Sequence, residues 1–158
     1  MFNFYPYTEN REKFSRALLN TFPFIKKETI GKSLVGRSLE AFTVGNKSKR
    51  IIMVGGVHGS EFLTINLLFN FLWDLCLSYL DGSAVAGIKM KRYLQRRGVT
   101  FVPCLNPDGT DINLFGYTSA EKYAGLIEYI CPHTCNWQAN ARGVDLNHNF
   151  PANWEVIH

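Results

Sequence analysis

A histidine and a carboxylate stand three residues apart in a glycine-rich segment of this chain. The segment, Gly55-Gly56-Val57-His58-Gly59-Ser60-Glu61, follows the apolar run Arg50 to Val54. A run of this kind is typical of a strand that is buried on both faces. Zinc binds imidazole nitrogen and carboxylate oxygen, and a catalytic zinc takes three protein ligands and a water. His58 and Glu61 could therefore supply two of the three zinc ligands.

Each of the two residues also has a purely structural interpretation. Glu61 precedes a predicted helix, where a carboxylate is favourable without any metal because of the helix dipole. His58 fits a hydrogen-bonded histidine in a loop whose glycines allow a sharp turn. The segment alone does not separate these alternatives, and motifs elsewhere in the chain must decide.

Two later motifs follow in a recognisable order. The first is Asn106-Pro107-Asp108-Gly109, and the second runs from Asn140 to Phe150 with the core Arg-Gly-Val-Asp-Leu-Asn. Together with His58-x-x-Glu61 they resemble the zinc carboxypeptidase family of metallopeptidases. The amino-acid sequence from Trp137 to Arg142 is most similar to that of the bacterial branch, which cleaves γ-D-glutamyl-diamino acid bonds in cell-wall peptides. The resemblance extends from about Gly36 to the last residue.

The resemblance implies roles for residues of the last motif. Asp145 would accept the second ring proton of His58 and orient this zinc ligand, as carboxylates beside metal ligands do. The alternative is an aspartate that binds only backbone groups at a strand end. Arg142 would polarise the scissile carbonyl and stabilise the developing oxyanion. The alternative for Arg142 is a surface ion pair.

Substrate binding is implied for Asn147 and His148, which match the Asn-Arg pair that holds the terminal carboxylate of the substrate in the family. Here histidine replaces arginine and offers neither a permanent charge nor a bidentate fork. This difference favours a substrate that presents another group, such as the amino-acid end of a branched wall peptide. Asn106-Pro107-Asp108-Gly109 is interpreted as a turn.

The resemblance thus implies zinc-dependent hydrolysis of a peptide bond, carboxypeptidase-like, on a peptide or a muropeptide. The family's third zinc ligand and its general base have no matching motif here, and no motif supports His133 or His158 as a third ligand. We therefore expect the N-terminal part of a catalytic domain, truncated after roughly its first half. The alternative is a catalytically inactive lobe or an interaction module.

Composition indicates an ordinary globular protein without affinity for nucleic acid. The 158 residues are 46% hydrophobic and 19% charged, with a net charge of +4. These values suit one domain with a real core. The basic residues are scattered, and those of 89–97 are interpreted as the solvated face of a helix.

Four cysteines and the N-terminal sequence bear on the compartment. Cys76 and Cys104 have apolar neighbours and are predicted to be buried thiols. Cys131 and Cys135 allow a metal site, a disulfide or a plain loop, and no second cysteine pair completes a zinc site. No secretory signal is recognisable, so a cytoplasmic location is expected.

The segment from Phe62 to Leu80 is long and apolar enough to suggest a membrane span. Four polar residues recur along it every four positions and form one stripe on a helix: Asn66, Asn70, Asp74 and Ser78. This pattern favours a helix packed on a sheet with one edge in water. No membrane partner is therefore expected.

The remaining elements alternate between strands and helices. Helices are predicted from about Glu9 to Asn20, capped by Thr8, and over 87–97 and 120–130. Strands are predicted over 25–30, 38–44, 50–54, 99–104 and 143–146. This order predicts a three-layer α/β/α fold with a mixed, mostly parallel sheet. Residues 1–158 would form one partial catalytic domain, with a helical segment over 1–23 and a sheet-and-helix lobe over 24–158.

Overall fold

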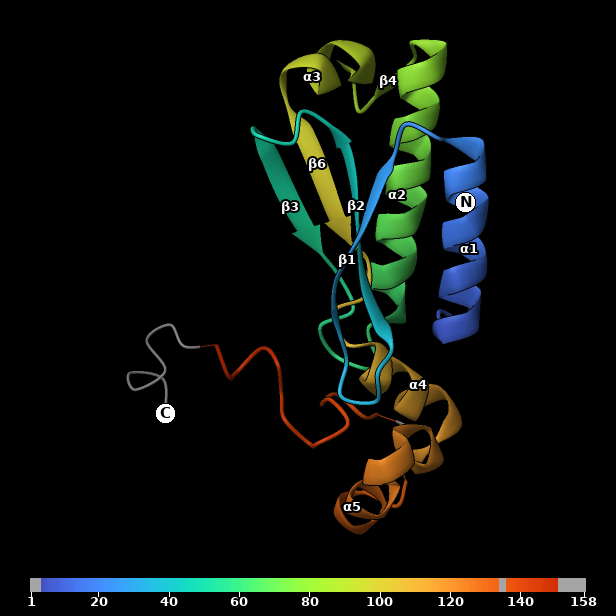
Figure 1. The fold of residues 1–158 in the computed structure, drawn as a ribbon, viewed down its shortest axis with the longest axis vertical. Coiled ribbons are helices and arrows are strands. Elements are labelled where there is room, and N and C mark those ends of the chain that lie inside the picture. Colours follow the sequence, from blue (N-terminus) through green and yellow to red (C-terminus); the bar gives the residue numbers. More distant parts are fainter. Residues whose placement is uncertain (1–3, 134–135, 151–158) are drawn as a thin grey trace.

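A four-stranded sheet with two long helices on one face organises the protein (Figure 1). The computed structural model describes residues 4–133 and 136–150. The strands β1 (Lys26–Lys32), β2 (Ser38–Gly45), β3 (Arg50–Val54) and β6 (Gly98–Val102) lie in the order β1-β2-β6-β3. The helices α1 (Thr8–Thr21) and α2 (Phe62–Asp81) lie side by side against the sheet.

The sheet is mixed, and this confirms the predicted α/β class. Only β3 and β6 pair in parallel, with Arg50 opposite Gly98 and Val54 opposite Val102. The pairs β1–β2 and β2–β6 are antiparallel. "Mostly parallel" was therefore wrong for the described residues. A parallel pair needs a long crossover, which here α2 provides, whereas β1 and β2 form a hairpin.

The core lies between the sheet and the two long helices. Its largest buried side chains come from α1 and the residue that follows it, from β2, from β6 and from α2: Leu18, Phe22, Phe42, Phe101, Ile65, Leu72 and Leu75. Aromatic rings join the layers, because Phe42 of β2 contacts Phe69 of α2 edge-on at 6.0 Å between ring centroids. In the described residues both long helices pack on this one face, so the second helical layer of the expected three-layer fold is not seen there.

Strand β3 contradicts one sequence-based expectation. Its bounds agree with the prediction, but Ile51, Ile52 and Val54 are 48%, 60% and 47% exposed. Within the part of the chain that the structure describes, β3 pairs only with β6 and forms an edge of the sheet. An apolar run thus predicted the strand correctly but not its burial, because burial depends on which elements pack against it.

The polar stripe of α2 also lies elsewhere than expected. Asn70 and Ser78 are buried, and the Asn66 side-chain amide donates to the Phe4 carbonyl oxygen (2.9 Å). Of the four residues in the stripe, Asp74 alone is exposed as predicted, and the water-facing side of the helix is otherwise largely apolar, with Leu63 79% exposed. Among the described residues, α2 is the one helix whose length and composition would allow a membrane span, and its buried face forms part of the core.

The Asn106-Pro107-Asp108-Gly109 motif begins a helix instead of forming an isolated turn. Asn106 is the N-cap of α4 (Pro107–Phe115), and its Oδ1 accepts a hydrogen bond from the Gly109 N–H (2.9 Å). Proline suits the first helical position because it has no N–H to leave unpaired. The helix predicted over 120–130 is divided in the structure into the end of the 3₁₀ helix η1 (Tyr117–Tyr123) and the helix α5 (Ala124–Ile130).

The predicted strand 143–146 does not form. The Asn140 N–H donates to the Val144 carbonyl (3.0 Å), the Gly143 N–H donates to the Asn140 carbonyl (3.1 Å), and the Val144 N–H donates to Asn140 Oδ1 (3.2 Å). These bonds form a local turn around Asn140 and use the backbone groups that a strand ladder would need.

Helix ends differ in two further places. Thr8 is the first residue of α1 and not its cap; its N–H and hydroxyl donate to the two carboxylate oxygens of Asp111, at 3.1 and 2.7 Å. A carboxylate from α4 therefore satisfies the start of α1. The helix predicted over 87–97 begins only at α3 (Met90–Arg96) and follows a short hairpin of β4 (Ala84–Val85) and β5 (Ile88–Lys89).

The two thiols predicted to be buried are buried. Cys76 is fully covered, and burial raises the pKa of its thiol to about 12. Burial also raises the pKa of the Cys104 thiol, so neither is a ready nucleophile. Cys131 is half-buried, whereas Cys135 lies outside the described residues, and the three interpretations of this pair remain predictions.

Candidate metal-binding site

The loop that joins β3 to α2 carries His58 and Glu61 at the carboxyl end of the parallel strand pair (Figure 1). Three backbone hydrogen bonds extend the ladder past β3: Gly55 N–H to Val102 O, Leu105 N–H to Gly55 O, and Asn106 N–H to Gly56 O. Ligands in open α/β sheets bind at carboxyl ends of strands. The local sequence thus places the loop where chemistry is expected.

The His58 ring and the Glu61 carboxylate are in direct contact. His58 Nδ1 lies 2.8 Å from Glu61 Oε1, while Glu61 Oε2 accepts backbone N–H groups from Val57 (3.1 Å) and His58 (3.2 Å). The three-residue spacing at the start of α2 makes this contact possible. Both side chains are reachable from solvent, with 22% of His58 and 34% of Glu61 exposed.

Asp145 lies on the other side of the imidazole. Its Oδ1 lies 3.4 Å from His58 Nε2, although the two residues are 87 positions apart in the sequence. The same oxygen accepts the N–H groups of Asn147 (2.8 Å) and His148 (3.2 Å), which hold the carboxylate in place. The ring therefore contacts one carboxylate at each nitrogen. The orienting role of Asp145 remains a prediction that this arrangement allows.

Electrostatics favour the charged form of the pair in the metal-free chain. The hydrogen bond to Glu61, aided by the charges of Glu61 and Asp145, raises the pKa of His58 against the opposing effect of burial. Partial burial alone would raise the pKa of Glu61, but the hydrogen bonds from His58 and Val57 outweigh it and lower that pKa. Burial would likewise raise the pKa of Asp145, but the backbone N–H groups of His148 and Asn147 donate to its carboxylate and lower that pKa.

These shifts predict a defined pH window for the stability of the metal-free chain. Protonated His58 stabilises the fold below its ordinary pKa of 6.5, and this contribution is lost as pH rises through the raised pKa. Ionised Glu61 contributes above 4.5, and its contribution is lost as pH falls through the lowered pKa. With metal removed by a chelator, the difference in Tm between wild type and His58→Gln should be largest between these values. A difference that is constant across pH would contradict the interaction.

The segment around Gln138 packs directly on the His58 loop, and sequence reasoning missed it. Gly59 N–H donates to the Gln138 carbonyl (3.0 Å), and the Gln138 side-chain amide donates to Ser60 Oγ (2.7 Å). The buried Asn106 amide donates to the carbonyls of Gln138 (3.2 Å) and Ala139 (3.1 Å). Asn106 thus ties the loop, the start of α4 and the 137–145 segment together. The Asn-Pro-Asp-Gly motif drew attention to Asn106, but the carbonyl groups of Gln138 and Ala139 that its amide binds are distant in the sequence.

Arg142, Asn147 and His148 lie exposed on the segment that follows Asn140. The Arg142 N–H donates to Asn140 Oδ1 (2.8 Å), and in residues 4–133 and 136–150 its guanidinium has no hydrogen-bond or ion-pair partner. The structure therefore brings His58, Glu61 and Asp145 together and leaves Arg142 open to solvent. The substrate-binding roles of these three residues stay predictions.

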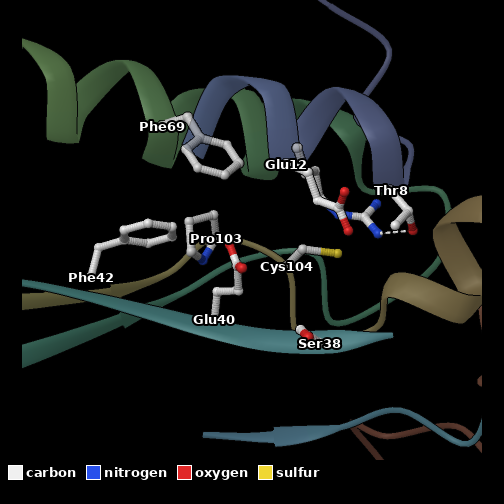
Figure 2. Close-up of a pocket in the computed structure, with 9 residues that line it drawn as sticks. Thr8, Glu12, Ser38, Glu40, Phe42, Phe69, Pro103 and Cys104 are labelled. Atoms are coloured by element: carbon white, nitrogen blue, oxygen red, sulfur yellow. Dashed lines mark hydrogen bonds between the residues drawn. The ribbon is translucent and has the colours of Figure 1, made fainter. Parts of the chain in front are cut away.

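Two cavities lie near this end of the molecule. The lining of one, about 460 Å³, includes Val144 and Leu146 but neither Asp145 nor His58. The other, about 30 Å³, lies between α1 and the sheet beside Glu40 and Cys104 (Figure 2). It has room only for a molecule the size of water. Neither cavity opens directly onto His58.

The donor set fits two positions of a zinc site. His58 Nδ1 and Glu61 Oε1 face each other at 2.8 Å, and imidazole nitrogen and carboxylate oxygen are both ligands that zinc takes in proteins, so these two residues would hold the ion. No group of three histidine, cysteine or acidic side chains that could hold a metal occurs in the described ranges 4–133 and 136–150. His133 is exposed, and His158 lies outside those ranges. Zinc fits this pair as a partial site.

Fold and site together define an α/β lobe that carries a histidine–carboxylate pair at the carboxyl end of its parallel strand pair. Residues 12–157 match the sequence profile of a family described as zinc carboxypeptidase. This chain belongs to the zinc carboxypeptidase family.

Individual relatives agree with this assignment. Gamma-D-glutamyl-L-diamino acid endopeptidase 1 of Lysinibacillus sphaericus is 29% identical over 144 residues, which cover 89% of this chain and 36% of the relative. Protein YqgT of Bacillus subtilis strain 168 is 30% identical over 150 residues, covering 92% and 40%. The crystal structure of thrombin activatable fibrinolysis inhibitor has the same fold, with a TM-score of 0.71 at 18% identity, covering 92% of this chain and 34% of that one. The chain thus spans two fifths or less of the length of each.

Proposed function

We propose that this chain supplies two zinc ligands, His58 and Glu61, to a zinc-dependent peptidase. The observation that carries the proposal is the 2.8 Å contact between His58 Nδ1 and Glu61 Oε1 at the carboxyl end of β3. Zinc, when bound, would polarise a carbonyl and lower the pKa of a water. Asp145 would hold the His58 ring by its Nε2 proton, and Arg142 would stabilise negative charge on the carbonyl oxygen.

We further propose a peptide of the bacterial cell wall as the substrate. The support is the name of the Lysinibacillus relative, a γ-D-glutamyl-L-diamino acid endopeptidase, together with His148 at the position where the family has arginine. Histidine holds a terminal carboxylate less firmly than arginine does, so a substrate with a different end group is favoured. A cytoplasmic location would suit an enzyme that processes wall peptides taken up for reuse.

A second candidate is a lobe without catalysis. The observation that favours it is the lack, within the described residues, of a third side chain beside His58 and Glu61 that could hold a metal. Such a lobe would interact with other molecules through the exposed edge strand β3 and its apolar side chains.

Zinc titration of the purified 158-residue chain separates the two candidates. We expect one zinc per chain in a competition assay with a chromophoric chelator. The His58→Ala variant should bind at least about tenfold more weakly, because loss of a carboxylate next to a metal ligand already costs 10–100-fold. His133→Ala removes an exposed histidine and is the matched control, with unchanged affinity expected. Equal affinity in His58→Ala would overturn the proposal, and no binding by wild type would favour the second candidate.

A further inference from the structure

The end of the molecule opposite His58 is strongly basic. Residues 45–50 and 86–100 carry eight of the chain's 17 lysines and arginines and no aspartate or glutamate. We call seven of these residues the basic end: Lys49, Arg50, Lys89, Lys91, Arg92, Arg96 and Arg97. The two segments meet in space, because the Gly98 N–H donates to the Lys49 carbonyl (2.9 Å) and Arg50 lies opposite Gly98 in the sheet.

The cations of the basic end are not neutralised by the fold. In the part of the chain that the structure describes, none of the seven forms an ion pair, whereas the eighth cation, Lys47, pairs with Glu28. One carboxylate near this end is Glu28. Its pKa is lowered by the hydrogen bond and charge of Lys47 and, to a smaller extent, by the charge of Arg50. Asp81 binds the Ser83 N–H. The unpaired positive charge therefore faces solvent and can attract an anionic partner.

The basic end also carries a hollow and apolar side chains. The hollow, about 570 Å³, is lined by Ile88, Lys89, Arg92, Tyr93, Arg96 and Arg97. Ile88 is 51% exposed and lies in the β4–β5 hairpin, whose turn residues Ala86 and Gly87 adopt positive φ. Leu80, in the last turn of α2 next to this hairpin, is 58% exposed. Apolar side chains thus project beside the cations.

We propose that the basic end binds an anionic phospholipid surface, with Ile88 and Leu80 entering the interface and the seven cations contacting headgroups. Clusters of four to eight lysines and arginines attract anionic leaflets, and apolar side chains beside them add binding by burial at the interface. Nucleic acid would use the cations but gives exposed aliphatic side chains no comparable environment. The proposal goes beyond the peptidase function and does not depend on it.

The topology gives this contact a defined orientation. Strand β3 runs from Arg50 at the basic end to the loop that carries His58, and Figure 1 shows α3 at one end of the sheet and α4 at the other. A membrane bound at α3 would therefore leave the His58–Glu61 pair facing away from it and open to a soluble substrate. This is compatible with the predicted cytoplasmic location, because the inner leaflet is anionic.

Vesicle sedimentation of the complete chain tests the proposal. We expect binding to phosphatidylcholine vesicles that contain phosphatidylglycerol, little binding to phosphatidylcholine alone, and release at high salt. Neutralising Arg92, Arg96 and Arg97 together with glutamine should weaken binding by about 100-fold. The matched control neutralises three exposed cations elsewhere, Lys13, Arg16 and Lys122, and should bind as wild type. Ile88→Ser should also weaken binding.

Three results would overturn this proposal. One is equal binding to charged and uncharged vesicles, and another is an equal loss in the control variant. The third is tight binding to a duplex DNA fragment that depends on the three arginines but not on Ile88, which would identify a polynucleotide as the partner. Because all the substitutions lie on exposed side chains, circular dichroism and thermal unfolding should match the wild type.

Discussion

Replacing Arg37 with methionine is expected to lower the free energy of unfolding by about 3–5 kcal/mol. The Arg37 guanidinium contacts Asp108 Oδ1 at 2.8 Å through Nη1 and Asp111 Oδ2 at 2.9 Å through Nε, and it donates to the Ser119 carbonyl at 3.0 Å. The side chains of the two aspartates are only 2% and 7% exposed. Removing the cation leaves two buried carboxylates without their main neutralising charge. Urea unfolding followed by circular dichroism measures the loss.

The matched control for Arg37→Met is Lys47→Met, which breaks an ion pair with Glu28 on the surface. There the side chains are 50% and 45% exposed, so water replaces the lost contact and the variant should unfold almost as the wild type does. Similar losses in the two variants would show that burial does not govern the Arg37 interactions. Arg11 also contacts Asp111, at 3.4 Å. If Arg11 partly neutralises Asp111 in Arg37→Met, the loss in unfolding free energy should lie near the lower end of the expected range.

The second large effect is expected for Gly59→Ala, in the loop that carries His58. A Cβ atom at Gly59 would lie 2.4 Å from the carbonyl oxygens of Gly109 and Trp137, both of which are backbone atoms. Backbone cannot rotate away as a side chain can, so the loop must shift from α4 and from the 137–145 segment. We expect a loss of about 1–3 kcal/mol in unfolding free energy, the range for overpacked cores. Zinc affinity should fall as well, because His58 moves relative to Asp145.

Gly125→Ala is the matched control for Gly59→Ala. Nothing lies within 4 Å of a Cβ at Gly125, which stands in the first turn of α5. Alanine there should be neutral or stabilise by up to about 1 kcal/mol, since it reduces the entropy of the unfolded chain. Unfolding experiments and the zinc titration on both variants check the pair. If Gly59→Ala matched wild type in both, the close packing of the loop would be wrong.

Elements whose cause is local were predictable from the sequence. The bounds of β3 agree with the prediction, and those of α1 and α2 differ by one residue. Periodicity and apolar runs are properties of neighbouring residues, so they predict where an element lies. The contact of His58 with Glu61 belongs to the same class, because three residues of chain between a strand and a helix already keep the two side chains close.

Features that depend on packing were predicted poorly. The apolar run of β3 suggested burial on both faces, but the strand lies at a sheet edge. The stripe of polar residues on α2 suggested that this edge of the helix is exposed to water, but the Asn66 amide binds the Phe4 carbonyl while Leu63 is exposed to water. A sequence pattern shows which face of a helix or strand is polar. Which element packs against that face depends on the arrangement of all the helices and strands. The same applies to Asp108, whose charge is balanced by Arg37 from the β1–β2 connection.

The family, the types and spacing of the two candidate zinc ligands, and the order of most strands and helices follow from the amino-acid sequence alone. The folded structure adds that Asp145 lies 3.4 Å from His58, that Asn106 joins three segments, and that seven cations gather at the end opposite the site. These two groups of features differ in distance along the chain: the chemistry of neighbouring residues is set by covalent geometry, while contacts between distant residues depend on how the sheet and helices pack.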